Sequence, residues 1–204
     1  MSKTITELQQ TLLAHTLPHV AFDGWSAAAL EHGAASAGLR HVEIMRAFPN
    51  GADGCLEAFM QQLDAQMVTA LSNAPLDTMK LPEKVATAIM ARFEAAAPHR
   101  EAVRKAVTHY AFPLHADQGM KRLYRTTDAI WRAIGDHPTD FSFYTKRLSL
   151  AMIYSSTLLF WLNDDSEGFA ETRAFLQRRL GDLMRFHRFR QSITDRFTPR
   201  QQEG

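Results

Sequence analysis

A 15-residue stretch without a charged side chain, Leu148–Leu162, most constrains how this chain can fold. A helix that crosses a bilayer needs roughly 20 apolar residues, and four Ser and Thr side chains interrupt this shorter stretch. Lys146 and Arg147 precede it closely, and Asp164 and Asp165 follow it. Because a helix that is apolar on all sides is normally buried, the stretch predicts a central core helix rather than a membrane span.

The composition fits one globular domain in a reducing compartment. The 204 residues are 46% hydrophobic and 22% charged, which suffices for a single core. Lys and Arg number 23 and Asp and Glu number 22, so the overall charge does not indicate a nucleic-acid binder. The single cysteine, Cys55, cannot form an internal disulfide, and the N-terminal sequence has no signal-peptide pattern. We therefore expect a cytoplasmic protein whose mature chain starts here.

Helix-favouring residues dominate the chain and alternating β-branched runs are absent, which predicts an all-α fold. Most prolines fall at the ends or in the first turns of the expected helices. We expect one domain built from an N-terminal part, residues 1–64, packed on a body, residues 65–197, with a loose polar tail at 198–204. The predicted helices span about 3–17, 26–37, 41–48, 51–72, 81–96, 98–112, 116–135, 138–162 and 166–197.

Residues 25–59 have the rhythm of a helix-turn-helix. A short helix of small residues ends at Ala37–Leu39, a second short helix ends at Pro49, and a longer helix follows. This pattern resembles the start of TetR-type repressors. Residues 1–64 contain three basic and seven acidic side chains, however, and contacts from Lys and Arg to phosphate supply most of the sequence-independent affinity for DNA. We therefore expect a vestigial helix-turn-helix that binds no nucleic acid.

The sequence contains no familiar catalytic or metal-binding motif. It lacks H-E-x-x-H, paired cysteines, a Gly-rich phosphate loop and G-x-S-x-G. His15 and His19 are four residues apart, but Pro18 is expected to end the helix that would align them. Cys55 could be a reactive thiol near a helix N-terminus, although a lone cysteine is more often a small buried hydrophobe. We expect a protein that is not an enzyme and has no metal site, and an enzyme using Cys55 is the least favoured hypothesis.

A pair of neighbouring aromatic residues indicates a surface. Phe143 and Tyr144 point about 100° apart on a helix, so burying both deeply is difficult. An exposed aromatic beside Asp128 and Asp140 would favour a partner-binding surface, and packing of both rings in the core is the alternative.

The final helix carries an apolar stripe in a basic surrounding. Residues 178–200 hold seven Arg residues and two Asp residues. A basic helix with such a stripe is typical of contact with an anionic bilayer, while packing on this domain or on a twin subunit is the alternative. The stripe consists of Phe186, Phe189, Ile193 and Phe197.

Three segments together resemble the coenzyme Q (ubiquinone) biosynthesis protein 9 family and its bacterial relatives. The second of them, Asp128–Phe169, is the most specific, since it combines a Trp, Gly-Asp, Thr-Asp-Phe and Tyr-Thr-Lys-Arg with the apolar helix and Asp-x-Ser. The resemblance covers roughly residues 22–188. The segments are "GWSAAALEHGA" (Gly24–Ala34), "DAIWRAIGDHPTDFSFYTKRLSLAMIYSSTLLFWLNDDSEGF" (Asp128–Phe169) and "TRAFLQRRLGDLM" (Thr172–Met184).

The resemblance implies a TetR-like all-α fold of about nine helices without DNA binding. It implies an accessory protein that needs no cofactor apart from a bound lipid, an isoprenoid ubiquinone precursor or a phospholipid. This protein would present the precursor to the di-iron hydroxylase of the pathway and would form a homodimer through its last two helices. The implied partner-binding residues are Asp128, Ile130, Asp140, Phe143 and Tyr144.

An isoprenoid tail requires a long apolar cavity, and methionine suits the wall of such a cavity because it is adaptable. The expected lipid-binding residues are Met67, Ile89, Met90, Phe93, Met120, Tyr124, Trp131, Ile153, Tyr154 and Phe160.

Two departures from the family qualify these expectations. Phe143 stands where the family often has Trp, and the chain ends at Gly204 without room for the separate C-terminal amphipathic helix of eukaryotic members. Transient peripheral contact with the inner membrane is therefore expected from the stripe between Phe186 and Phe197. The alternative function is a TetR-type transcriptional regulator with an apolar small-molecule effector.

Overall fold

A computed structural model describes residues 4–135 and 142–197, and for residues 142–145 and 186–197 it describes the backbone but not the side chains. The described residues form helices and no strand, so the predicted all-α class with about nine helices is confirmed. The helices are α1 (Ile5–Asp23), α2 (Ala27–Ser36), α3 (His41–Ala47), α4 (Gly51–Ser72), α5 (Leu81–Ala96), α6 (Arg100–Ala111), α7 (Ala116–Ala133), α8 (Ser142–Trp161) and α9 (Ala170–Phe197).

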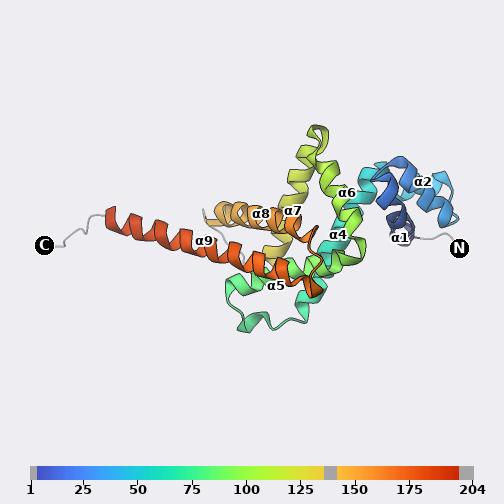
Figure 1. The fold of residues 1–204 in the computed structure, drawn as a ribbon. Helices are drawn as coiled ribbons and strands as arrows, with labels where there is room; N and C mark the ends of the chain where they lie inside the picture. The colour runs from blue at the N-terminus through green and yellow to red at the C-terminus, as the bar shows by residue number, and fades with distance from the viewer. Residues whose placement is uncertain (1–3, 136–141, 198–204) are drawn as a thin grey trace.

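The helices form an elongated molecule in which α1 and the end of α9 lie at opposite ends (Figure 1). Helices α1 to α3 make one end, α4 to α8 make the body, and α8 runs beside the first half of α9. Short 3-10 turns connect several helices, including η3 (Pro113–His115) between α6 and α7 and η4 (Glu167–Phe169) before α9.

Helix α1 is longer than predicted, because it continues through Pro18 to Asp23. A proline inside a helix costs about 3 kcal/mol, but α1 buries Leu12, Leu13, Leu17 and Val20 on both sides of it. This apolar packing outweighs the cost, so the expectation that the helix ends near residue 17 is wrong. The Pro18 side chain itself is exposed on the outer side of the helix.

The N-terminal helices pack closely through small residues. A Cβ atom added to Gly33 in α2 would lie 2.4 Å from Thr16 Oγ1 and 2.7 Å from Thr16 Cα in α1. Only glycine permits this approach of the two helices. Trp25 joins this end to the body, since its Nε1 donates a hydrogen bond to the Ala102 carbonyl of α6 at 2.9 Å.

Helix α4 crosses the expected boundary at residue 64 without interruption. It contacts α1 and α2 at one end of the molecule and α5 and α7 in the body. The N-terminal part and the body therefore share one continuous helix.

The charge-free stretch lies in α8 as far as Trp161, as predicted, but its burial is uneven. Trp161 and Thr157 are fully buried, and Trp161 stacks on Phe93 with ring centroids 5.2 Å apart. Leu148, Met152 and Leu159 are 63%, 60% and 54% exposed. The expectation of a helix buried on all sides is wrong for this face, because no other element of the described chain covers it. No helix in the described residues has the length and hydropathy of a membrane span.

The turn between α8 and α9 is organised by Asp164. Its Oδ1 accepts hydrogen bonds from the amide and hydroxyl of Ser166 at 2.8 and 2.6 Å. Its Oδ2 accepts hydrogen bonds from the amide and hydroxyl of Thr172 at 2.8 and 2.5 Å. Burial acts to raise the pKa of Asp164, but these hydrogen bonds outweigh it and hold the pKa at about 2. The buried carboxylate therefore fixes the angle at which α9 leaves α8.

Candidate functional site

A cavity of about 370 Å³ lies between helices α4 to α8. Most of its wall is apolar, and every one of the five helices contributes side chains to it. An apolar cavity with a few polar groups is the usual form of a site for a small hydrophobic ligand. The apolar wall consists of Met60, Val103, Val107, Tyr110, Ala111, Ala116, Gly119, Met120, Leu123, Leu158 and Leu159.

The position of the opening follows from the exposure of two lining residues. Met120 of α7 is 66% exposed and Leu159 of α8 is 54% exposed, although both line the cavity. These two side chains therefore mark its rim. Gly119 brings α7 close to α6 near this rim, since a Cβ atom there would lie only 2.9 Å from Tyr110 Cβ.

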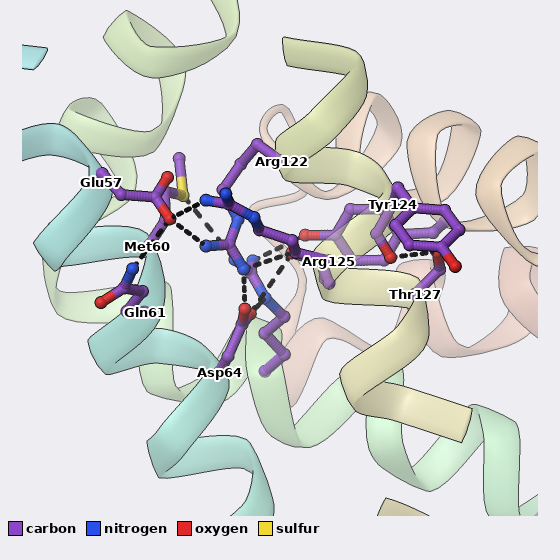
Figure 2. Close-up of polar contacts among 11 residues, drawn as sticks. Glu57, Met60, Gln61, Asp64, Arg122, Tyr124, Arg125 and Thr127 are labelled. Atoms are coloured by element: carbon purple, nitrogen blue, oxygen red, sulfur yellow. Dashed lines mark hydrogen bonds and ion pairs between the residues drawn. The ribbon is translucent and has the colours of Figure 1, made fainter. Parts of the chain in front are cut away.

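Charged and hydroxyl side chains form one side of the cavity. We call them, together with the Asp64 carboxylate that they contact, the polar floor: Asp64, Arg92, Arg122, Thr126 and Tyr154. Arg92 Nε donates to Asp64 Oδ1 at 2.7 Å, and Arg92 Nη1 donates to the Tyr154 hydroxyl at 2.6 Å. Arg122 Nη2 pairs with Asp64 Oδ2 and lies 3.2 Å from Thr126 Oγ1. Figure 2 shows the contact between Asp64 of α4 and Arg122 of α7. Both guanidinium groups are buried.

A second carboxylate supports the polar floor from its outer side. Glu57 Oε1 accepts hydrogen bonds from Arg122 Nη1 at 3.0 Å and from the more exposed Arg125 at 2.7 Å (Figure 2). Gln61 also donates to this oxygen, at 2.9 Å. The guanidinium groups of Arg92, Arg122 and Arg125 thus share two carboxylates, those of Asp64 and Glu57. These five charged side chains together carry an excess of positive charge.

Burial sets the protonation of the polar floor. It raises the pKa of Tyr154, although Arg92 and Arg122 act in the opposite direction, so the hydroxyl keeps its proton at neutral pH. Burial also lowers the pKa of Arg122, and the neighbouring Glu57 opposes this shift. Arginine still stays charged in proteins. The floor therefore presents cationic and hydroxyl donors to the cavity at neutral pH.

Three other depressions are larger but less suited to an apolar ligand. The smallest of them, of about 420 Å³ beside α6, includes Asp23, Lys105 and His109 in its wall. One of about 590 Å³ lies between α5 and α9 and includes Glu83, Arg173 and Gln177 in its wall. Another of about 730 Å³ lies beside α4 and includes Asp53, Glu57 and other polar side chains. Charged walls of this kind favour water over an apolar chain, so we regard the α4–α8 cavity as the candidate site.

The ten residues expected to bind lipid are spread over several environments. Met120 and Tyr154 line the cavity, and Met90 lines the depression between α5 and α9. Met67, Ile89 and Phe93 are fully buried and pack in the core.

The other four expected lipid-binding residues also lie outside the cavity wall. Trp131 and Ile153 are buried in the core, and Tyr124 is exposed. Phe160 stacks on Phe175 of α9 with ring centroids 4.6 Å apart. The sequence therefore identified two of the lining residues and assigned core residues to the wall.

The polar floor itself was not predicted, although the sequence contained a signal for it. Asp64 follows Leu63 and precedes Met67, and Arg92 directly precedes Phe93. Both charged residues thus fall on the buried faces of helices whose neighbours are apolar. A buried charge requires a partner, so the pair could have been proposed from this spacing.

The residues expected to bind a partner are only partly described. Asp128 forms ion pairs with Arg132 at 2.8 Å and with Arg147 of α8. Ile130 is fully buried, so its side chain cannot contact a partner in this structure, and that expectation is corrected. Asp140 and the side chains of Phe143 and Tyr144 lie outside the described residues.

The expected membrane stripe also falls outside the described side chains. Helix α9 continues to Phe197, so its backbone has the predicted form. The side chains concerned are those of Phe186, Phe189, Ile193 and Phe197.

Cys55 does not have the environment of a nucleophile. The thiol is fully buried at the start of α4. Burial raises its pKa to about 12, although a hydrogen bond with Thr16 acts to lower it. A catalytic cysteine requires a thiolate at neutral pH, so the structure speaks against an enzyme that uses Cys55.

The histidines occur in two arrangements that the sequence did not predict. His19, Asp23 and His32 lie close enough to share a metal ion, and so do Asp53, His109 and His115. His19 and its group come together because α1 continues through Pro18, whereas His15 is exposed outside this group. Since the ligands of each group come from more than one helix or turn, sequence spacing alone could not reveal them.

The arrangement of the helices defines the class of protein as TetR-like. The structure is similar to the crystal structure of the TetR transcriptional regulator from Nitrosomonas europaea ATCC 19718, with a TM-score of 0.70 and 21% sequence identity. The similarity covers 86% of this chain and 97% of that one. At this identity the likeness shows the fold alone, and it confirms the TetR-like fold that the sequence predicted.

The sequence comparisons show which proteins the chain is similar to. Residues 116–187 match the COQ9 family model. The chain is 28% identical over 185 residues to the human ubiquinone biosynthesis protein COQ9, mitochondrial, and 31% identical over 185 residues to that of Xenopus tropicalis. Each of these matches covers 87% of this chain. The chain is thus similar to the COQ9 proteins over most of its own length, as the three segments indicated.

The homologues are longer proteins. The chain spans 58% of the human and Xenopus tropicalis proteins and 56% of the Drosophila melanogaster protein. The family domain of residues 116–187 contains α7 and α8, and these two helices supply Arg122, Thr126 and Tyr154 to the polar floor. The region that matches the family model therefore supplies part of the candidate site.

Proposed function

We propose that this chain is an accessory protein of ubiquinone biosynthesis that binds a lipid and catalyses no reaction itself. The α4–α8 cavity carries the proposal, because its volume and apolar wall suit part of an isoprenoid chain. The names of the homologues support the pathway. In this function the chain holds a quinone precursor, or a phospholipid in its place, and presents it to the di-iron hydroxylase of the pathway.

The exposed apolar face of α8 supports a homodimer. Leu148, Met152 and Leu159 follow one another at helical spacing and are all exposed. A second copy of the chain could cover them, in agreement with dimerisation through the last two helices. Leu159 also belongs to the rim of the cavity, so such a dimer would place the opening next to the subunit interface.

The hydroxylase and the membrane would then contact other surfaces of the protein. Asp128, Asp140, Phe143 and Tyr144 remain the proposed contact with the hydroxylase. The end of α9 remains the proposed contact with the inner membrane, which would make the protein peripheral and cytoplasmic. Truncation after Met184 should reduce liposome binding, and equal binding by the truncated and full chains would contradict the role of α9.

The lipid itself can be identified directly. Protein purified under native conditions should release an isoprenoid or a phospholipid into organic solvent, detected by mass spectrometry. Ser155 lines the cavity, so Ser155→Phe should fill part of it and remove the lipid. Ser72→Phe, the same substitution at the exposed end of α4, is the matched control and should retain the lipid. Absence of any lipid, with no rise in Tm on adding quinone analogues, would contradict the proposal.

A further inference from the structure

The polar floor contains more hydrogen-bond donors than acceptors. The Tyr154 hydroxyl accepts a hydrogen bond from Arg92, and no acceptor for its own proton is recorded among the described residues. Arg122 Nε is buried and has no hydrogen-bond partner there either. Arg92 Nη2 reaches only the Met60 sulfur, at 3.7 Å, and a thioether is a weak acceptor. All three residues with these donors line the cavity.

The acceptors of the floor are already occupied. Asp64 Oδ1 accepts from Arg92 at 2.7 Å and from Thr126 at 3.3 Å, and Oδ2 accepts from Arg122. Glu57 accepts from Arg122, Arg125 and Gln61. The carboxylates are thus fully engaged on the protein side, while donors on the cavity side remain available.

The charges of the floor lead in the same direction. Arg92 and Arg122 are both buried, Asp64 pairs with both of them, and Glu57 divides its charge between Arg122 and the exposed Arg125. Burying uncompensated positive charge is costly. A negatively charged oxygen in the cavity would offset this cost and accept the unused donors at the same time.

We propose that the polar floor binds an oxyanion head group, a carboxylate, phosphate monoester or phenolate, of an amphiphile whose chain lies along the apolar wall. The inference rests on the proposed lipid-binding function and adds the chemical class of the ligand. Met120 and Leu159 at the rim are apolar, so the chain would point outward and the head group inward.

Amphiphiles of one chain length but different head groups test the proposal. Decanoate and decyl phosphate should bind the full-length protein roughly 10- to 100-fold more tightly than decanol, because hydrogen bonds to charged groups are the stronger ones. Decylamine should bind no better than decanol, since its ammonium group meets like charge. Dissociation constants from isothermal titration calorimetry in one buffer allow the comparison.

The outcomes separate this inference from the function on which it rests. Equal binding of decanoate, decyl phosphate, decanol and decylamine would overturn the head-group proposal and leave lipid binding intact. Binding of none of the four, and of no quinone analogue, would contradict the proposed function as well. Tighter binding of decyl phosphate than of decanoate would identify a phosphate as the preferred oxyanion, and the reverse would identify a carboxylate.

A pair of matched variants locates the head group. Tyr154→Phe keeps the ring and removes one donor, so decanoate affinity should fall roughly 10-fold while decanol affinity stays unchanged. Tyr124→Phe makes the same change at an exposed residue of α7 outside the cavity wall, and it should alter neither affinity. Thermal unfolding of both variants establishes that the protein is folded. Equal losses for decanoate and decanol in Tyr154→Phe would overturn the placement of the head group.

Discussion

The N-terminal end and the body share one TetR-like fold but are packed in different ways. Helices α1 and α2 meet so closely that Gly33 leaves no space for a Cβ atom against Thr16. The body instead contains the cavity, with buried Arg92 and Arg122 in its wall. The same architecture is therefore solid where α1 and α2 meet and hollow in the body, where the apolar wall and the cationic floor suit a ligand.

The charges of the two regions differ as well. The N-terminal residues 1–64 are acidic overall, and Glu43 of α3 accepts a hydrogen bond from the Arg40 amide at 2.9 Å. The polar floor of the body is cationic. A helix-turn-helix that bound DNA would need the positive charge at the N-terminal end, whereas here it lies inside the body. The difference favours the proposed ligand binding over DNA binding.

The largest expected effect comes from disturbing the solid end. Gly33→Ala should lower the free energy of unfolding by about 3 kcal/mol, because the new Cβ atom would overlap Thr16 at 2.4 Å and its backbone at 2.7 Å. Urea unfolding followed by circular dichroism measures the loss. The folded fraction should still bind lipid, since the cavity wall contains no residue of α1 or α2.

Gly181→Ala provides the control for this substitution. Nothing lies within 4 Å of a Cβ atom there, so the change should raise the stability of α9 by up to ~1 kcal/mol. Equal effects of the two substitutions would mean that the α1–α2 contact is looser than the structure indicates.

The next effect concerns the turn that directs α9. Asp164→Ala removes the acceptor of four hydrogen bonds from Ser166 and Thr172 and should cost about 2 kcal/mol at pH 7, from a carboxyl pKa lowered from 3.8 to about 2. Asp165→Ala, at an exposed neighbouring carboxylate, should change Tm little.

The pH dependence of this effect has a definite sign. Because the pKa of Asp164 is depressed in the folded state, its contribution is fully present above pH ~4 and is lost as the pH falls through about 2. The Tm difference between wild type and Asp164→Ala should therefore be constant from pH 7 to pH ~4 and shrink below it. A difference that grows on acidification would contradict the role assigned to the carboxylate.

Alkylation of Cys55 tests whether the N-terminal end and the body stay in contact, because Cys55 lies in α4 against Thr16 of α1. The thiol is fully buried and its pKa is about 12, so alkylation by iodoacetamide at pH 7 should be undetectable over the time in which denatured protein reacts completely. Mass spectrometry measures the labelled fraction. Rapid labelling of the native protein would mean that the N-terminal end opens from the body.

The helices could be predicted from the sequence far better than the cavity. Proline positions and apolar spacing placed α4 and α5 at the residues where the structure has them, because both signals are local. Pro18 was misleading, since tertiary packing of α1 outweighs its local cost.

Lining and core residues could not be separated in the same way. Ile89 and Phe93 have the same apolar character as Leu158 and Val107, but only the latter two face the cavity. The difference arises from how five helices diverge, and no single helix encodes that divergence. Asp64 and Arg92 were the exception, because charges on apolar faces indicate a buried polar group.

The smallest expected effect tests whether the N-terminal end has lost DNA binding. Helix α3 exposes Val42, Met45 and Arg46, so a helix of the right shape is present, but residues 1–64 carry three basic side chains against seven acidic ones. Electrophoretic mobility shift with the surrounding genomic DNA should give no complex even at low salt, where phosphate contacts are strongest. A complex that weakens as salt is added would favour a transcriptional regulator, and the oxyanion amphiphile would then be its effector.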